Sequence, residues 1–89
     1  MGKKFDETLK YLGSDYDIAN YDFEKVIHRK IGEYDIEISG LNSRGTRYDI
    51  SIYIWKNHHQ IRSIHGICSK EELSKHLETV VQGLLSHQD

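Results

Sequence analysis

The chain has 89 residues, a net charge of −2 and nine aromatic residues, and 37% of its residues are hydrophobic. A chain of this length and composition is expected to form one domain, residues 1–89, with a single compact core, and it is not intrinsically disordered. The weak net charge argues against the basic surface of a typical nucleic-acid-binding protein. No apolar run approaches the ~18 residues of a membrane-spanning helix.

Residues 3–12 are predicted to form a short helix. Phe5, Leu9 and Leu12 recur at helical spacing, and Gly13 stands where a left-handed residue commonly ends a helix. A helix this short is stable only when it packs on another element.

Acidic residues are concentrated in the first part of the chain. Residues 5–24 contain six acids and only one base, Lys10. We interpret this segment as a solvated acidic flank, with an acidic docking surface for a basic partner as the alternative. Within it, residues 14–22 are predicted to form an acidic connecting loop.

Residues 23–31 fit either a helix or a strand. Their apolar residues are four apart, as on one face of a helix. As a strand, the segment would form a hairpin through a tight turn at Gly32, with Ile27 opposite Ile38. That register brings apolar residues together on one side and opposite charges on the other, so we favour the strand.

Two further strands are predicted from strict alternation of apolar and polar residues, over Tyr34–Ser39 and Tyr48–Trp55. Two registers between them are compatible with this alternation. Placing Ile38 opposite Ile50 avoids the like-charge pair that the alternative register creates, so this register is predicted. The connecting loop is then residues 41–47.

A polar turn at residues 56–59 leads to the last predicted strand, Gln60–Ile67. In the simplest register Arg62 lies opposite Tyr53. This pairing puts a cationic and an aromatic side chain side by side on one face of the sheet.

The second helix has the clearest start signal in the chain. Ser69 as the N-cap residue and Glu72 three residues later form a capping box. The residues that follow place their apolar side chains on one stripe, as in an amphipathic helix. Residues 86–89 are expected to fray into a tail.

Together these segments predict an α+β fold in which one helix precedes four strands and a second helix follows them. The strands form an antiparallel meander sheet, and both helices pack on one face of it because each has one apolar stripe. The predicted core comprises the apolar residues between these layers: Leu9, Leu12, Ile36, Ile38, Ile50, Ile52, Ile54, Leu73, Leu77, Val80 and Leu84.

Catalytic residues, cofactors and metal ions are not expected. His58, His59, His65, His76 and Cys68 are possible zinc ligands, but a single thiol lacks the paired spacing of a structural zinc site. Cys68 precedes a helix N-terminus, where a thiol pKa can fall, yet a buried structural cysteine is the simpler interpretation. A single cysteine also excludes an intramolecular disulfide and favours a cytoplasmic location.

The sheet face away from the helices is the predicted partner-binding surface. Tyr53 and Trp55 point to it if the isoleucines of their strand form the core. Arg62 is expected beside Tyr53, with Lys56 and Arg47 near the rim. Aromatic side chains beside arginine are typical of protein interfaces. We therefore expect a small non-enzymatic interaction module that binds a protein partner or a second copy of itself, and no membrane.

Two other functions stay open at this stage. The same aromatic and basic side chains are what a single-stranded nucleic-acid-binding or regulatory protein uses. The small size and the acidic flank also permit a small inhibitor encoded by a mobile element.

Overall fold

The computed structural model describes residues 3–21, 23–43 and 45–86. In the described chain one helix precedes five strands and a second helix follows them. The strands form one antiparallel sheet in the order β1-β2-β3-β4-β5. The elements are α1 (Lys3–Leu12), β1 (Asp17–Tyr21), β2 (Glu24–Ile31), β3 (Tyr34–Ser39), β4 (Ile50–Lys56), β5 (His59–Ile67) and α2 (Lys70–Ser86). The α+β fold, with helices before and after an antiparallel meander, is confirmed. The sheet is open and has five strands where four were predicted.

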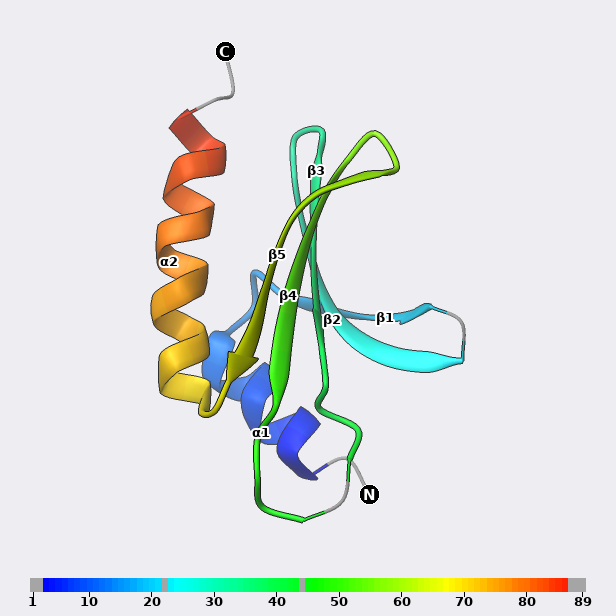
Figure 1. Ribbon diagram of the computed structural model, residues 1–89, viewed down its shortest axis with the longest axis vertical. Coiled ribbons are helices and arrows are strands. Elements are labelled where there is room, and N and C mark those ends of the chain that lie inside the picture. The colour runs from blue at the N-terminus through cyan, green and yellow to red at the C-terminus, as the bar shows by residue number, and fades with distance from the viewer. Residues whose placement is uncertain (1–2, 22, 44, 87–89) are drawn as a thin grey trace.

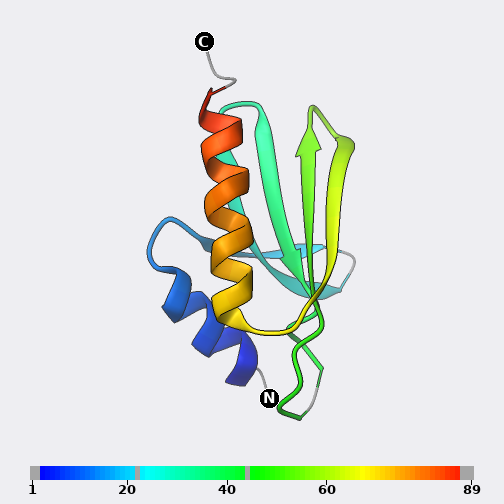
Figure 2. The same ribbon diagram turned by 60° about the vertical axis from the view of Figure 1, so that its left-hand side comes forward.

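Both helices lie on one face of the sheet (Figures 1 and 2). In both views α2 runs along the sheet, and α1 lies close to the N-terminal end of α2. The predicted bounds of α1 are confirmed, and Gly13 has the expected left-handed φ of 94°. In the described part of the chain, neither helix has the length and apolar character that crossing a membrane requires.

The additional strand is β1, so the predicted loop over residues 14–22 is wrong across Asp17–Tyr21. This segment pairs with β2, with Ile18 opposite Ile27 and Ala19 opposite Val26. Most of its side chains are exposed because it is an edge strand of a projecting hairpin, so it has no alternating apolar pattern. Residue 22, the last of the predicted loop, lies outside the described residues.

The strand interpretation of residues 23–31 is confirmed by β2, and its predicted register with β3 is also confirmed. Gly32 has a φ of 57° at the first position of the β2–β3 turn. Two cations, Lys25 and Arg29, lie on the apolar side of this strand. Nζ of Lys25 lies 4.3 Å from the ring centre of Phe5. The guanidinium of Arg29 lies 5.3 Å from the ring centre of Tyr16 and 4.0 Å from a carboxylate oxygen of Asp15, which explains how a charge is tolerated there.

The predicted register between β3 and β4 is wrong by two residues. Ile38 lies opposite Ile52 instead of Ile50, and Glu37 lies opposite Tyr53. The observed register also avoids a like-charge pair, and it pairs β3 along its whole length. At its end the backbone of Gly40 packs against the backbone at Asp49 and Ile50, so β4 begins at Ile50 and not at Tyr48.

The predicted pairing of Arg62 with Tyr53 is also wrong, because the β4–β5 ladder is irregular. Trp55 pairs with Gln60, but Ile54 pairs with Arg62, which leaves one extra residue in β5. The two-residue turn before β5 has positive φ at both Asn57 (49°) and His58 (71°), as a type I′ hairpin requires. This bulge moves the side chains that follow it to the opposite face, and a second shift, between the pairs Ile52–Ile64 and Ile50–Ile67, turns Ile67 into the core.

The predicted N-cap of α2 is confirmed, because Oγ of Ser69 accepts a hydrogen bond of 3.0 Å from the backbone N–H of Glu72. All predicted core residues are buried except Leu9 and Leu12, which are half-buried at the margin of the core. Ser86 still belongs to α2, and the rest of the predicted tail lies outside the described residues. The buried apolar residues that were not predicted are Phe5, Tyr16, Val26, Ile27, Ile31, Leu41 and Ile67.

Candidate functional site

The face of the sheet opposite the helices, which we call the outer face, carries polar and aromatic side chains. Alternation along β3 and β4 turns the isoleucines toward the helices. The cross-strand pair Asp35–Trp55 therefore lies on the outer face. The pair Glu37–Tyr53 lies there too.

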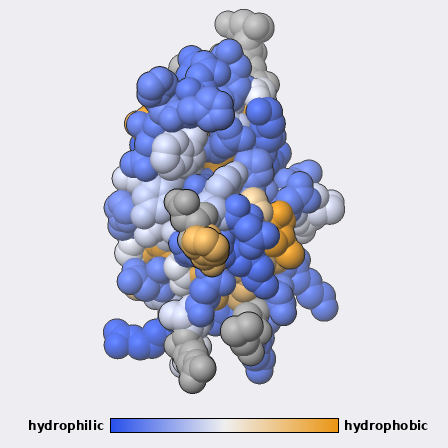
Figure 3. Space-filling model, turned by 90° about the vertical axis from the view of Figure 1, so that its right-hand side faces the viewer, coloured by the Kyte–Doolittle hydropathy of each residue, from blue (hydrophilic) through white to orange (hydrophobic). Residues whose placement is uncertain are grey.

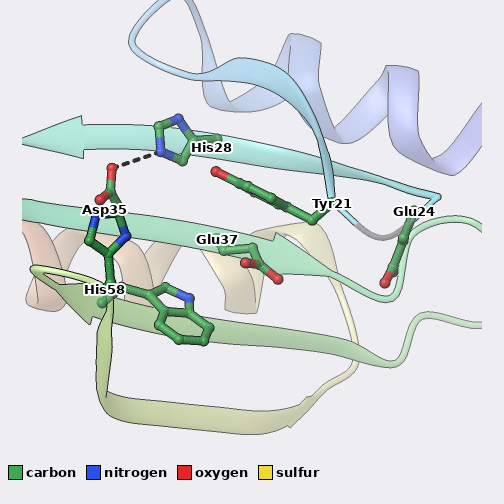
Figure 4. Close-up of a pocket in the computed structure, with 7 residues that line it drawn as sticks. Tyr21, Glu24, His28, Asp35, Glu37 and His58 are labelled. Carbon is green, nitrogen blue, oxygen red and sulfur yellow. Dashed lines mark hydrogen bonds and ion pairs between the residues drawn. The ribbon is translucent and has the colours of Figure 1, made fainter.

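A hollow of about 540 Å³ opens on this face, and we call it the outer hollow. It is lined by Tyr21, Glu24, His28, Asp35, Glu37, Trp55 and His58. Glu24 lies at one end of the hollow, and Asp35 and His58 lie at the other (Figure 4). Its volume is within the range of ~300–1,000 Å³ that is common for ligand sites.

The β1–β2 hairpin forms one wall of the hollow. The hairpin runs away from the upright strands of the sheet (Figure 1), and Tyr21 and Glu24 are the paired residues at its end. The Tyr21 side chain extends from the hairpin toward His28 (Figure 4), with 6.4 Å between the ring centres. The opposite wall includes His58 from the β4–β5 turn.

The electrostatic character of the outer hollow is acidic. Three carboxylates line it, and the described lining includes no lysine or arginine. Asp35 accepts a bond of 3.0 Å at Oδ1 from Nε2 of His28 when that nitrogen is protonated. The pKa of Tyr21 is raised, mainly by burial and further by the negative charges of Asp35 and Glu37.

Trp55, which lines the hollow, carries a buried hydrogen-bond donor that is unused among the described residues. Nε1 of Trp55 is buried and has no hydrogen-bond partner among the described residues. Leaving such a donor unsatisfied costs about 1–3 kcal/mol. A bound group that accepts this hydrogen bond would recover that free energy.

The predicted site residues do not all lie together. Tyr53 and Trp55 share the outer face as predicted, and Tyr53 packs edge-on against His65, with 5.5 Å between ring centres. Arg62 pairs with Ile54, so it leaves β5 on the helix side, away from Tyr53. Lys56 is also on the helix side, with its Nζ 5.5 Å from the centre of the Tyr34 ring.

Arg47, the last predicted site residue, lies exposed in the β3–β4 loop. Its backbone carbonyl accepts a hydrogen bond of 2.6 Å from Nζ of the buried Lys4, which also donates to Oγ of Ser43 at 2.8 Å. Arg47 is thus held where α1 meets the loop, and it does not line the outer hollow. The structure gathers the predicted aromatic residues on one face and does not gather the predicted basic residues with them.

The residues of the hollow that the sequence analysis missed are Tyr21 of β1 and the acids and histidines of β2, β3 and the β4–β5 turn. The alternative interpretation of residues 5–24 as an acidic docking surface was the signal that pointed toward it, since Glu24 belongs to that segment. The bend of the β1–β2 hairpin brings Tyr21 over the outer face, and no local sequence pattern predicts that bend.

No cluster of three or more potential metal ligands occurs among the described residues. His65 is instead hydrogen-bonded to Oγ of Ser51 at 3.0 Å and to Oγ of Ser63 at 3.2 Å.

Cys68 is exposed, so the expectation of a buried cysteine is wrong. Ile67, which is 1% exposed, fills the core position just before it, and alternation turns the thiol outward.

No protein-family model, no curated protein and no solved structure matches this chain. Functional inference therefore depends on the geometry and charge of the outer hollow.

Proposed function

We propose that this protein is a non-enzymatic interaction module that binds a protein partner by accepting a lysine or arginine side chain in the outer hollow. The single observation that carries the proposal is the convergence of three carboxylates and two aromatic side chains on one hollow: Glu24, Asp35, Glu37, Tyr21 and Trp55. A cationic side chain complements both sets of groups. Carboxylates bind it through charge-assisted hydrogen bonds, and aromatic rings attract it through their π faces.

The donor of Trp55 adds a second element of recognition. Nε1 is buried and has no partner among the described residues, so a rotation of the indole ring that exposes it would let it donate to a backbone carbonyl of the bound segment. A partner that supplies both a cation and a nearby carbonyl is a polypeptide. We place the interaction in the cytoplasm, because a chain with a single, exposed cysteine suits a reducing compartment.

The same geometry gives less support to single-stranded nucleic acid as the ligand. That function requires lysine or arginine side chains beside the aromatic residues, because contacts to phosphate supply most of the affinity. Arg62 and Lys56 lie on the helix side of the sheet, and the hollow beside Trp55 is acidic.

The proposal is tested by fluorescence titration, since Trp55 is the only tryptophan in the chain. The probe is a nonapeptide of three Gly-Arg-Ser repeats, and the control peptide has glutamine in place of arginine. We expect the arginine peptide to change the Trp55 emission saturably and the glutamine peptide to leave it unchanged.

Two double variants with the same net charge separate the hollow from general acidity. Glu24→Gln/Glu37→Gln should weaken binding about tenfold, equivalent to 1.4 kcal/mol. Glu71→Gln/Glu78→Gln, on the exposed side of α2, should leave the affinity within twofold. Equal weakening by the two variants would show that the peptide responds to overall charge, and the proposed site would then be rejected.

A further inference from the structure

Phe23, at the turn of the β1–β2 hairpin, combines an exposed side chain with a left-handed backbone, and folding does not explain this combination. Its side chain is fully exposed, at 110% of the reference area, so it contributes nothing to the core. Its backbone is left-handed, with φ 68°, a conformation in which a side chain larger than that of glycine or asparagine is unfavourable. Glycine at this position would relieve the backbone without loss of a buried contact.

Phe23 belongs to a group of exposed apolar and aromatic side chains on the same hairpin. Tyr21 is 43% exposed and lines the outer hollow, whereas Ile18, which is 50% exposed, pairs with the buried Ile27 and so faces the helix side. We call Tyr21 and Phe23 the hairpin patch. The view onto this side of the molecule shows separate apolar side chains surrounded by hydrophilic ones (Figure 3). Single apolar residues framed by polar ones are typical of the anchors of protein interfaces.

The hairpin patch is continuous with the outer hollow, because Tyr21 belongs to both and Glu24 follows Phe23 directly. A partner segment that enters the hollow must therefore pass the hairpin end. A segment of twelve extended residues spans about 40 Å, which is enough to reach both places.

We propose that Phe23 is an apolar anchor that inserts into the same partner whose basic side chain occupies the outer hollow. This inference rests on the proposed function and adds the chemistry of the partner, which combines a cation with an apolar pocket or side chain close by. The three carboxylates of the outer hollow, beside which Phe23 lies, favour such a basic polypeptide over an anionic lipid surface.

The test begins with a phage-displayed library of random 12-residue peptides, selected on the wild-type protein. We expect selected peptides that combine arginine or lysine with apolar residues. Phe23→Gly should weaken these peptides at least tenfold while its melting temperature equals or exceeds that of the wild type. The control is Leu85→Ala, which removes another exposed apolar side chain (51%) from α2 and should leave binding unchanged.

Each result decides between the two proposals. Basic peptides that bind Phe23→Gly as well as wild type overturn the anchor and leave the proposed function standing. A selection that yields no binders, or binders without basic residues, overturns both. A lower melting temperature for Phe23→Gly overturns the anchor, since it assigns Phe23 a role in folding. Binding of the wild type, but not of Phe23→Gly, to phosphatidylcholine vesicles also overturns it and points to lipid.

Discussion

Alanine substitutions at Gly40 and Gly45 test whether a backbone contact sets the register on which the outer hollow depends. Both glycines have the same left-handed φ of 91°. A Cβ atom on Gly40 would collide with the backbone carbonyl oxygen of Asp49 and would lie 3.3 Å from Cα of Ile50. A Cβ atom on Gly45 would meet no atom within 4 Å. The two substitutions therefore share the conformational cost, and only Gly40→Ala adds a collision with backbone.

The size of each effect follows from these contacts. A left-handed alanine costs about 1–2 kcal/mol, which is the whole expected effect of Gly45→Ala. Forcing an extra carbon into close-packed surroundings costs about 1–3 kcal/mol more, so Gly40→Ala should lose about 2–5 kcal/mol in total. That loss is a large fraction of the roughly 5–13 kcal/mol expected for a domain of this size.

Urea denaturation followed by circular dichroism measures both free energies of unfolding under identical conditions. A difference of about 2 kcal/mol between the variants also separates their melting temperatures by roughly 8–16 °C. If the two variants are equally stable, the close approach of Gly40 to Asp49 does not constrain the β3–β4 register, and the reasoning is refuted.

Three further predictions concern the elements that support the sheet. Ser69→Ala removes the N-cap hydrogen bond to Glu72 and should lower the free energy of unfolding by about 1 kcal/mol, measured by urea denaturation, whereas Ser69→Asp should retain most of it. Lys4→Met keeps the apolar stem but removes both hydrogen bonds of Nζ; it should cost about 2 kcal/mol in the same assay and increase amide hydrogen exchange in the β3–β4 loop. Burial raises the pKa of Tyr16 above its ordinary value of 10.0, against the opposing effect of Arg29. The folded state therefore favours the neutral phenol, so its contribution to stability is complete below pH 10 and is lost as the pH rises through the folded-state pKa. The melting temperature of the wild type should therefore fall relative to that of Tyr16→Phe as the pH rises above 10; a constant difference would contradict this.

The core was predictable even where the strand register was wrong. Side chains in a strand alternate with a period of two, so a register error of two residues leaves every side chain on its correct face. Ile38 faces Ile52 and not Ile50, but all three are buried as predicted. The β1 strand was missed for a different reason. Its pairing with β2 stabilises it, and its exposed side chains form no apolar pattern.

The site was less predictable, because it depends on features that change which face a side chain occupies. The extra residue in β5 shifts the register with β4 by one residue, and this shift places Arg62 opposite Ile54 on the helix side. The aromatic pair of β4 was placed correctly because β4 keeps its alternation. The acids of the hollow come from β2 and β3, and Tyr21 of β1 joins them where the β1–β2 hairpin bends away from the rest of the sheet (Figure 1).

The choice of residues at the hairpin turns connects the fold to the proposed interface. The β2–β3 turn meets its need for a positive φ with Gly32, the residue that folding favours there. The other two turns hold His58 and Phe23 at φ 71° and 68°, where glycine would be less strained. His58 lines the outer hollow, and Phe23 stands between two residues that line it. Residues other than glycine with a positive φ therefore occur at the β1–β2 and β4–β5 turns, which border the hollow. The β2–β3 turn, which does not border it, uses glycine. Backbone strain retained beside a site is expected where the side chain serves binding, because stability alone would select glycine.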